Sequence, residues 1–334
     1  MQPVLADEHS LALACEHLAA GRLVGVPTET VYGLAANAFD PLAVRRIYTA
    51  KGRPDNNPLI VHVAGSDQLP DVVDWPLDAE TGRLLDAIID LWPGPLTVVL
   101  PRARRIPDEV TAGLSTVAVR IPKHPVMQSL LTRCGFPVAA PSANRSKYVS
   151  PTTAQHVVDG LGDQVAMVLD GGRCSVGLES TIVSLRPSPR ILRPGTVTAE
   201  MLAKRWGVPA ASLLPSGAKS PAVDEPAVLE APGMMLQHYS PTTRLAFADD
   251  ATSSTKGQVG RIAFAPLPDS RLTEYAVVRV LSQSGDLMEV ASGLFAALRE
   301  LDQLQLDWIL VDRCSSDGIG RAIMDRLTRA VANH

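Results

Sequence analysis

The sequence contains few aromatic residues and few cysteines. Aromatic residues make up 4% of the 334 residues and hydrophobic residues 46%, so we expect aliphatic cores like those of α/β proteins with buried strands. The four cysteines, Cys15, Cys134, Cys174 and Cys314, lie far apart and form no CxxC pair. This spacing indicates neither a zinc cluster nor a disulfide framework, and it favours reduced, mostly buried thiols in a cytosolic protein.

Charge and hydropathy argue against further classes. The net charge is −4, which gives no overall basicity for nucleic-acid binding, so any polyanion site must be a local basic pocket. No window approaches 18 apolar residues, and the N-terminus has no charged stretch followed by a long apolar run. We therefore expect neither membrane spanning nor secretion, and we predict a cytoplasmic protein.

Common nucleotide-binding and catalytic motifs are also missing. There is no GxxxxGK[ST] loop and no GxGxxG at a strand-to-helix turn, so neither the P-loop nor the dinucleotide fingerprint is present. HExxH, GxSxG and paired-histidine spacings do not occur either. If ATP binds, side chains such as Lys51, Arg53 and Arg193 must hold it, with help from hydroxyl and amide groups.

A hydroxyl-rich turn follows the first predicted buried strand. That strand covers residues 23–26 and ends at a proline, after which the sequence reads TETVYG. Thr28, Glu29, Thr30 and Tyr32 in this run supply several oxygens close together. Gly33 leaves room for a ligand or for another backbone segment. The turn is therefore a candidate wall of a binding cleft.

A capped helix and a basic loop come next. Asp40 and Pro41 predict the N-cap and first residue of a helix that ends near residue 50. Lys51 and Arg53 then follow in the run KGRPDNN, which we expect to be an irregular loop with amides beside the cations. Two cations so spaced suit a phosphate or carboxylate. A solvated basic loop would show the same spacing, so the pattern alone leaves both interpretations open.

Two later strands are predicted to end in polar residues. The strand at 116–121 carries Arg120 in an otherwise apolar run, and we favour a ligand-facing arginine over an edge strand with Arg120 in water. The strand at 137–140 delivers Ser142 and Asn144 to a turn, at a strand end where α/β sheets often bind ligands. Serine and asparagine are also ordinary turn formers, so this motif is weak by itself.

The composition changes near residue 213. Residues 213–241 hold five prolines and little periodicity, which predicts an extended linker. The remainder has the pattern of a small α/β domain, with strands at 244–247, 260–265, 276–281 and 308–312 and helices at 287–301 and 319–332. We therefore predict domains at 1–212 and 242–334, joined by a linker at 213–241.

Several of these segments together resemble one family. PTETVYGL at 27–34, KGRPDNNPL at 51–59 and PSAN at 141–144 are similar to motifs of the threonylcarbamoyl-AMP synthase family, whose core is a YrdC-type domain. The ending GIGRAIMDRLTRA resembles the C-terminal extension of its two-domain form. The resemblance implies a YrdC-like twisted mixed sheet with flanking helices and a concave site, plus a smaller Rossmann-like α/β C-terminal domain.

The resemblance also implies a role for the linker. In the two-domain form, an element with Pro232, Gly233, Met234, His238 and Tyr239 returns over the active site. The alternative is that the methionines and Tyr239 simply pack the linker onto a domain surface.

The reaction implied by the resemblance is condensation of L-threonine, bicarbonate and ATP to threonylcarbamoyl-AMP and pyrophosphate. Such a reaction needs the reactants to be positioned together and negative charge to be neutralised, and we find no convincing general base. Mg²⁺ would bridge phosphate oxygens without a dedicated carboxylate cage, so we expect no protein metal ligand. The product would pass to a separate tRNA threonylcarbamoyl transferase, and direct tRNA binding is left open.

The family pattern assigns residues to each substrate. Lys51 and Arg53 would stabilise the developing phosphate charge and so act as the catalytic residues. The implied ATP contacts are Lys51, Arg53, Asn57, Thr116, Ser142, Asn144, Ser150, Arg193 and Tyr239. The implied threonine contacts are Thr30, Tyr32, His62, Arg120, Ala140 through its backbone, and Ser180, with Arg120 the natural partner of the substrate carboxylate.

Two other functions are kept as alternatives. An RNA-binding module could use the same basic cleft, although the net charge and the scarcity of aromatic residues argue against it. A carbamoyl-adenylating enzyme like those of hydrogenase maturation is the other alternative. Those proteins carry cysteine-rich zinc modules, which this sequence lacks.

Overall fold

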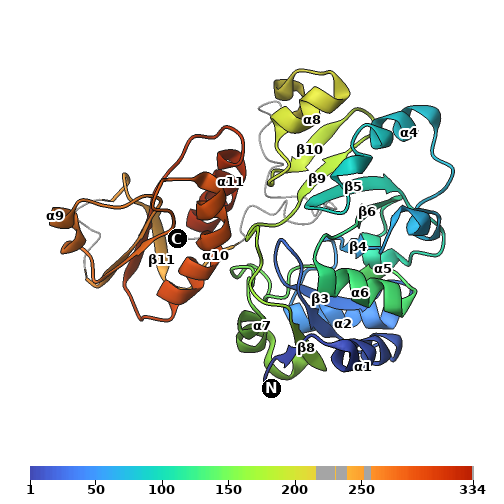
Figure 1. Cartoon of the computed structure of the whole chain (residues 1–334), viewed down its shortest axis with the longest axis horizontal. Coiled ribbons are helices and arrows are strands. Elements are labelled where there is room, and N and C mark those ends of the chain that lie inside the picture. The colour runs from blue at the N-terminus through green and yellow to red at the C-terminus, as the bar shows by residue number, and fades with distance from the viewer. Residues whose placement is uncertain (216–229, 231–238, 252–256, 333–334) are drawn as a thin grey trace.

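A computed structural model describes residues 1–215, 230, 239–251 and 257–332. These residues form two sheets, a ten-stranded one in the order β1-β8-β2-β3-β7-β4-β6-β5-β9-β10 and a four-stranded one in the order β11-β14-β12-β13. Figure 1 shows the corresponding large unit, coloured blue to yellow, beside a small unit coloured orange to red. The predicted α/β architecture with a mixed sheet and a smaller second sheet is confirmed.

The large sheet contains both parallel and antiparallel neighbours. Parallel pairs include β4 with β6 and β5 with β9, whereas β2 with β3 and β9 with β10 are antiparallel. Its strands are β1 (Val4–Leu5), β2 (Val24–Val26), β3 (Gly33–Asn37), β4 (Ile60–His62), β5 (Leu96–Pro101), β6 (Thr116–Arg120), β7 (Val138–Ala139), β8 (Met167–Asp170), β9 (Thr181–Ser184) and β10 (Arg190–Arg193).

The helices of the large unit are short. They are α1 (Glu8–Ala19), α2 (Pro41–Lys51), α3 (Leu69–Val72), α4 (Ala79–Asp86), α5 (Asp108–Thr111), α6 (Pro125–Cys134), α7 (Ala154–Leu161) and α8 (Ala199–Trp206), with 3₁₀ turns at Ser66–Gln68, Ile89–Leu91, Gly162–Gln164 and Ala210–Leu213. The predicted start of α2 is confirmed, because the Asp40 side chain accepts hydrogen bonds from the Leu42 and Ala43 backbones. Gly52 follows in the left-handed region at φ 59°, so Lys51 is the last helical residue and not part of a loop.

Several elements differ from the sequence prediction. β3 was not predicted, because its sequence GLAAN lacks the β-branched and aromatic residues typical of strands. It pairs with β2 as a hairpin in which Val26 faces Gly33, so the hydroxyl-rich turn is the connecting loop. The sequence of residues 78–91 predicts one continuous helix, but the segment forms α4 followed by a separate 3₁₀ turn. α8, which begins at the Thr198 N-cap, was not predicted either.

The small unit is a parallel sheet with its two longest helices on the side of the large unit (Figure 1). Its strands are β11 (Arg244–Phe247), β12 (Val259–Ala263), β13 (Val277–Val280) and β14 (Trp308–Val311), and its helices α9 (Asp269–Leu272), α10 (Leu287–Asp302) and α11 (Gly320–Val331). The predicted elements of this region are confirmed to within about two residues. Figure 1 shows α10 and α11 between the small sheet and the large unit.

The two units share a hydrophobic core. Leu294, Phe295 and Leu327 of the small unit belong to the same buried cluster as Val149 and Leu178 of the large unit. The relative position of the units is therefore fixed by apolar packing as well as by the polar contacts described below.

Much of the predicted linker lies outside the described residues. This applies to Pro232, Gly233, Met234 and His238 of the predicted covering element. Tyr239 is described and is buried. The division at 1–212, 213–241 and 242–334 stays a prediction. None of the helices in the described ranges is long and apolar enough to cross a membrane.

Candidate active site

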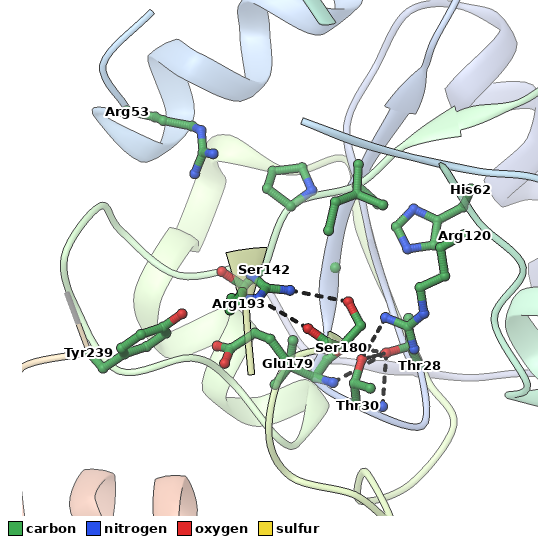
Figure 2. A pocket seen from close by; sticks show the side chains of 15 residues that line it. Thr28, Thr30, Arg53, His62, Arg120, Ser142, Glu179, Ser180, Arg193 and Tyr239 are labelled. Atoms are coloured by element: carbon green, nitrogen blue, oxygen red, sulfur yellow. Dashed lines mark hydrogen bonds between the residues drawn. The ribbon is translucent and has the colours of Figure 1, made fainter. Parts of the chain in front are cut away.

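A pocket lies where the β2–β3 loop, the ends of β4 and β6, the turn after β7 and the segment before β9 meet. Figure 2 shows Arg120 and His62 on one side of this pocket in that view, Tyr239 on the other and Arg193 pointing between them. Its lining is Thr28, Thr30, Val31, Gly33, Arg53, Ile60, His62, Arg120, Ala140, Pro141, Ser142, Glu179, Ser180, Arg193 and Tyr239.

Arg120 is buried in an ion pair. β6 lies between β4 and β5, so the alternative of a solvent-exposed edge strand is wrong. Nη2 of Arg120 is 2.7 Å from Oε1 of Glu29, and Nη1 donates to Oγ1 of Thr30 at 2.8 Å. Burial raises the pKa of Glu29, but Arg120 and hydrogen bonds lower it by more, so it lies below its ordinary value. The sequence analysis placed Glu29 in the hydroxyl-rich turn but did not predict it as the partner of Arg120.

His62 lies beside Arg120 on the neighbouring strand. The two residues are in register across β4 and β6. Burial lowers the pKa of His62 to about 3, and the charge of Arg120 contributes in the same direction. His62 is therefore a neutral imidazole at physiological pH. Within the described part of the chain, its Nδ1 atom makes no hydrogen bond.

Lys51 joins two of the sequence motifs. Its Nζ donates to the backbone carbonyls of Ser142 at 2.6 Å and of Asn144 at 2.5 Å. Burial lowers the pKa of Lys51 well below its ordinary value, and the charge of Arg53 lowers it further. The side chain ties the end of α2 to the PSAN turn, and it lies outside the pocket lining.

Arg53 is held in one orientation by its own loop. Its Nε donates to the Asn57 carbonyl at 3.0 Å, and its Nη2 donates to Asn57 Oδ1 at 2.5 Å and to the Pro58 carbonyl at 2.8 Å. Burial lowers the pKa of Arg53 to about 10. Asn57 thus orients Arg53. Arg53 lines the pocket, whereas Asn57 does not.

Arg193 is fixed by Ser180. Its Nε donates to the Ser180 carbonyl and its Nη2 to the Ser180 hydroxyl, both at 3.1 Å, as Figure 2 shows. The same hydroxyl also shares a hydrogen bond of 2.8 Å with Thr97. Burial lowers the pKa of Arg193 from its ordinary value. A second buried guanidinium is therefore rigidly presented to the pocket.

Glu179 is the pocket carboxylate that the sequence analysis overlooked. Its Oε1 accepts from the Ser150 hydroxyl at 2.5 Å, and its Oε2 accepts from Arg326 Nε of α11 at 2.9 Å. Its place directly before Ser180, after a glycine-containing loop, was a signal that could have been used. Thr28, which was predicted as part of the cleft wall, lines the pocket, and its hydroxyl organises the turn by donating to the Val31 carbonyl at 2.6 Å.

The remaining predicted residues are placed in two ways. Asn144 lies behind the pocket wall, where its Nδ2 donates to the Tyr148 carbonyl at 2.9 Å. Tyr32 and Thr116 lie away from the pocket: the Tyr32 hydroxyl donates to the Gly172 carbonyl at 2.7 Å, and Thr116 pairs with Pro101 at the far end of β6. Most of the predicted polar residues thus gather around one cavity or support its walls, and these two do not.

Comparison with known proteins identifies the family. Residues 16–195 match the family described as "Telomere recombination", and residues 197–332 match the one described as "Threonylcarbamoyl-AMP synthase, C-terminal domain". The chain is 37% identical to threonylcarbamoyl-AMP synthase of Bacillus subtilis, over 97% of this chain and 93% of the relative. It belongs to the threonylcarbamoyl-AMP synthase family. The resemblance that the three motifs carried is confirmed.

Relatives from an archaeon support the same assignment. The chain is 35% identical to threonylcarbamoyl-AMP synthase of Pyrococcus abyssi, over 97% of this chain and 94% of that one. It superposes on the crystal structure of Pyrococcus abyssi Sua5 complexed with L-threonine, with a TM-score of 0.85 over 98% of this chain and 95% of that chain. The chain is therefore an enzyme of threonylcarbamoyl-AMP synthesis, as predicted, and the RNA-binding module is not favoured.

Proposed function

We propose that the pocket holds ATP and L-threonine together and converts them, with bicarbonate, to threonylcarbamoyl-AMP and pyrophosphate. The threonine amine takes up bicarbonate to form a carbamate and water. A carbamate oxygen then attacks the α-phosphorus, the bond from that phosphorus to the β-phosphate oxygen breaks, and pyrophosphate leaves. The observation that carries this proposal is the pair of buried, hydrogen-bonded guanidinium groups, Arg53 and Arg193, in one pocket with the polar cluster around Arg120.

Arg53 and Arg193 are proposed to bind the triphosphate. Both cations are shielded from water and held by neighbouring groups, so they can stabilise charge on the departing pyrophosphate without first reorganising. Lys51 uses two of its three N–H bonds on carbonyls, which leaves one donor for a phosphate oxygen. These three residues carry the proposed catalytic charge, and the proposal includes no general base.

Other residues would complete the nucleotide site directly or through a neighbour. Ser142 and Tyr239 line the pocket and are proposed as direct contacts. Asn57, Asn144 and Ser150 would act through the groups they hydrogen-bond. We do not extend the proposal to Thr116.

Threonine is proposed to bind on the Arg120 side of the pocket. Because a guanidinium has five N–H donors, Arg120 can hold Glu29 and Thr30 and still donate to a substrate carboxylate. The neutral imidazole of His62 offers a further polar atom there, and Ala140 and Ser180 form nearby walls. The binding of L-threonine by the Pyrococcus abyssi relative supports this substrate. We do not extend the proposal to Tyr32.

Mg²⁺ is proposed to arrive with ATP as part of the substrate. The carboxylates of Glu179 in the pocket lining and of Glu29 beside Arg120 already have partners, Glu29 with Arg120 and Glu179 with Arg326 and Ser150. Phosphate oxygens and water would therefore supply most of the metal ligands. The product is a mixed anhydride, which suits transfer by a separate tRNA threonylcarbamoyl transferase.

The test is a reconstitution of the reaction. The purified protein is incubated with ATP, Mg²⁺, L-threonine and bicarbonate, while pyrophosphate release is followed and threonylcarbamoyl-AMP is sought by mass spectrometry. We expect product only when both threonine and bicarbonate are present, and a large loss on omission of Mg²⁺. Tight ATP binding with no threonylcarbamoyl-AMP would refute the proposal.

A further inference from the structure

An arginine from the small unit reaches the pocket in the large unit. Arg326 lies on α11 and is only 1% exposed. Its Nε donates to Glu179 Oε2 at 2.9 Å, and its Cζ lies 5.3 Å from the centre of the Tyr239 ring. Glu179 and Tyr239 both line the pocket. The C-terminal unit thus contacts two pocket residues through one buried side chain.

Neighbouring hydrogen bonds fix the contact between Arg326 and the large unit. Its Nη1 donates to Asp325 at 2.7 Å, which orients the guanidinium. A second buried arginine, Arg299 of α10, donates to the backbone carbonyls of Val149 at 2.5 Å and Ser150 at 3.4 Å. The small unit therefore acts on both carboxylate oxygens of Glu179. Arg326 binds one oxygen directly, and Arg299 binds the backbone of Ser150, whose hydroxyl binds the other.

The charge of Glu179 is the feature that requires an explanation. A carboxylate on the wall of a pocket for triphosphate repels the ligand, and burial strengthens the repulsion because water cannot screen it. A buried ion pair is often no more stabilising than apolar residues of similar volume, so stability alone does not account for the pair. Lys51 and Arg193 also lie near enough to interact with Glu179, but Lys51 is bound to carbonyls and Arg193 to Ser180.

We propose that Arg326 is a positioning residue for ATP: it cancels the charge of Glu179 and holds this carboxylate beside Ser150, so that the triphosphate can approach Arg53 and Arg193. The proposal rests on the proposed function of the pocket as the ATP site. It gives the C-terminal unit a specific part in substrate binding. In the view of Figure 2, Glu179 lies between Tyr239 and Ser180, on the Arg193 side of the pocket.

The test compares steady-state kinetics of variants at α11. Arg326→Met leaves Glu179 without its counterion, and we expect the KM for ATP to rise about tenfold or more, with a smaller change in the KM for threonine. Arg326→Lys keeps the charge and is expected to remain within about threefold of the original KM for ATP. Combining Glu179→Gln with Arg326→Met removes both charges and should restore the KM for ATP towards that of the unaltered chain.

A matched control is available on the same helix. Arg321 makes an exposed ion pair with Glu200 of the large unit at 3.2 Å, so Arg321→Met breaks a contact between the units away from the pocket. We expect Arg321→Met to leave the KM for ATP unchanged. If Arg326→Met does not fold, Arg326→Gln, which keeps a donor amide but no charge, gives the same test.

Two results would overturn the proposal. One is a KM for ATP in the Arg326→Met or Arg326→Gln variant that equals that of Arg321→Met. The other is a double variant whose KM for ATP stays as high as that of Arg326→Met. Arg193→Met separates this failure from failure of the proposed function: if Arg193→Met raises the KM for ATP and Arg326→Met does not, the pocket still binds ATP and only the role of Arg326 is refuted. If neither variant changes the KM for ATP, the ATP site itself is refuted.

Discussion

Replacing Arg53 by methionine should lower turnover strongly while changing the free energy of unfolding little. Arg53 is buried, and its pKa of about 10 indicates that burial disfavours its charge. This shift from the ordinary value of 12.5 corresponds to about 3 kcal/mol against the charged form in the folded state. A buried cation that is costly to the fold, and that faces a pocket, is expected to serve ligand binding.

The opposing contribution comes from hydrogen bonds. Arg53→Met leaves acceptors on Asn57 and Pro58 without their donor, at a cost of about 1–3 kcal/mol. The two contributions nearly cancel, so we expect the free energy of unfolding to change by no more than about 2 kcal/mol. Turnover should fall about 10²-fold, because a preorganised charge near the departing pyrophosphate is lost.

The assay combines thermal unfolding by circular dichroism with initial rates of pyrophosphate release at varied ATP. Arg45→Met provides the control, since Arg45 lies on α2, the helix just before Arg53, with its side chain 65% exposed, and pairs with Glu109. We expect Arg45→Met to retain both stability and turnover. A variant at Arg53 that loses much of its folded population, yet keeps normal turnover per folded molecule, would refute the reasoning.

Three further predictions concern pH, the pocket hydroxyl and the cysteines. The pKa of His62 is about 3 in the folded chain, whereas its ordinary value is 6.5. As the pH falls below 6.5, His62 therefore takes up a proton in the unfolded chain but not in the folded chain, and this destabilises the fold. Between pH 7 and pH 5, the free energy of unfolding of the unaltered chain should therefore fall by about 2 kcal/mol more than that of His62→Gln. If urea unfolding at the two pH values gives the same fall for both proteins, the prediction is wrong. Ser180→Ala removes a hydrogen-bond acceptor of Arg193, and such a bond contributes about 1 kcal/mol, so we expect the KM for ATP to rise about fivefold. An unchanged KM for ATP in the pyrophosphate assay would count against the proposed positioning of Arg193 by Ser180. The Sγ atoms of Cys15 and Cys134 lie 2.9 Å apart on α1 and α6, so diamide should cross-link them, slowly at neutral pH because burial raises the pKa of the Cys134 thiol. Peptide mass spectrometry that finds no such link after long oxidation would exclude it.

Local patterns in the sequence were enough for many individual elements. The start of α2 follows from Asp40 and Pro41, whose capping chemistry involves only their next few neighbours. The elements of the small unit follow from apolar periodicity, because a helix or strand with one buried face repeats its apolar residues regularly. The motifs around Thr30, Lys51 and Ser142 identified the family, because a family is recognised by the residue types in its motifs and by their order along the chain.

Other features depended on segments that are far apart in the chain. β3 forms because β2 and β7 pair with its two sides, and its own residues give little strand preference. Lys51 donates to carbonyls 91 and 93 residues away, so its spacing to Arg53 could not reveal that it clamps the PSAN turn.

The sequence by itself determined which polar groups this chain has for its chemistry and, through short motifs, the family and the class of reaction. Only the tertiary structure decided which charges cancel one another. Arg120 meets Glu29 across the large sheet, and Glu179 meets Arg326, which is 147 residues away on another unit. The physical reason is that periodicity and capping act over a few residues, whereas the partner of a buried charge is chosen by the packing of the whole fold.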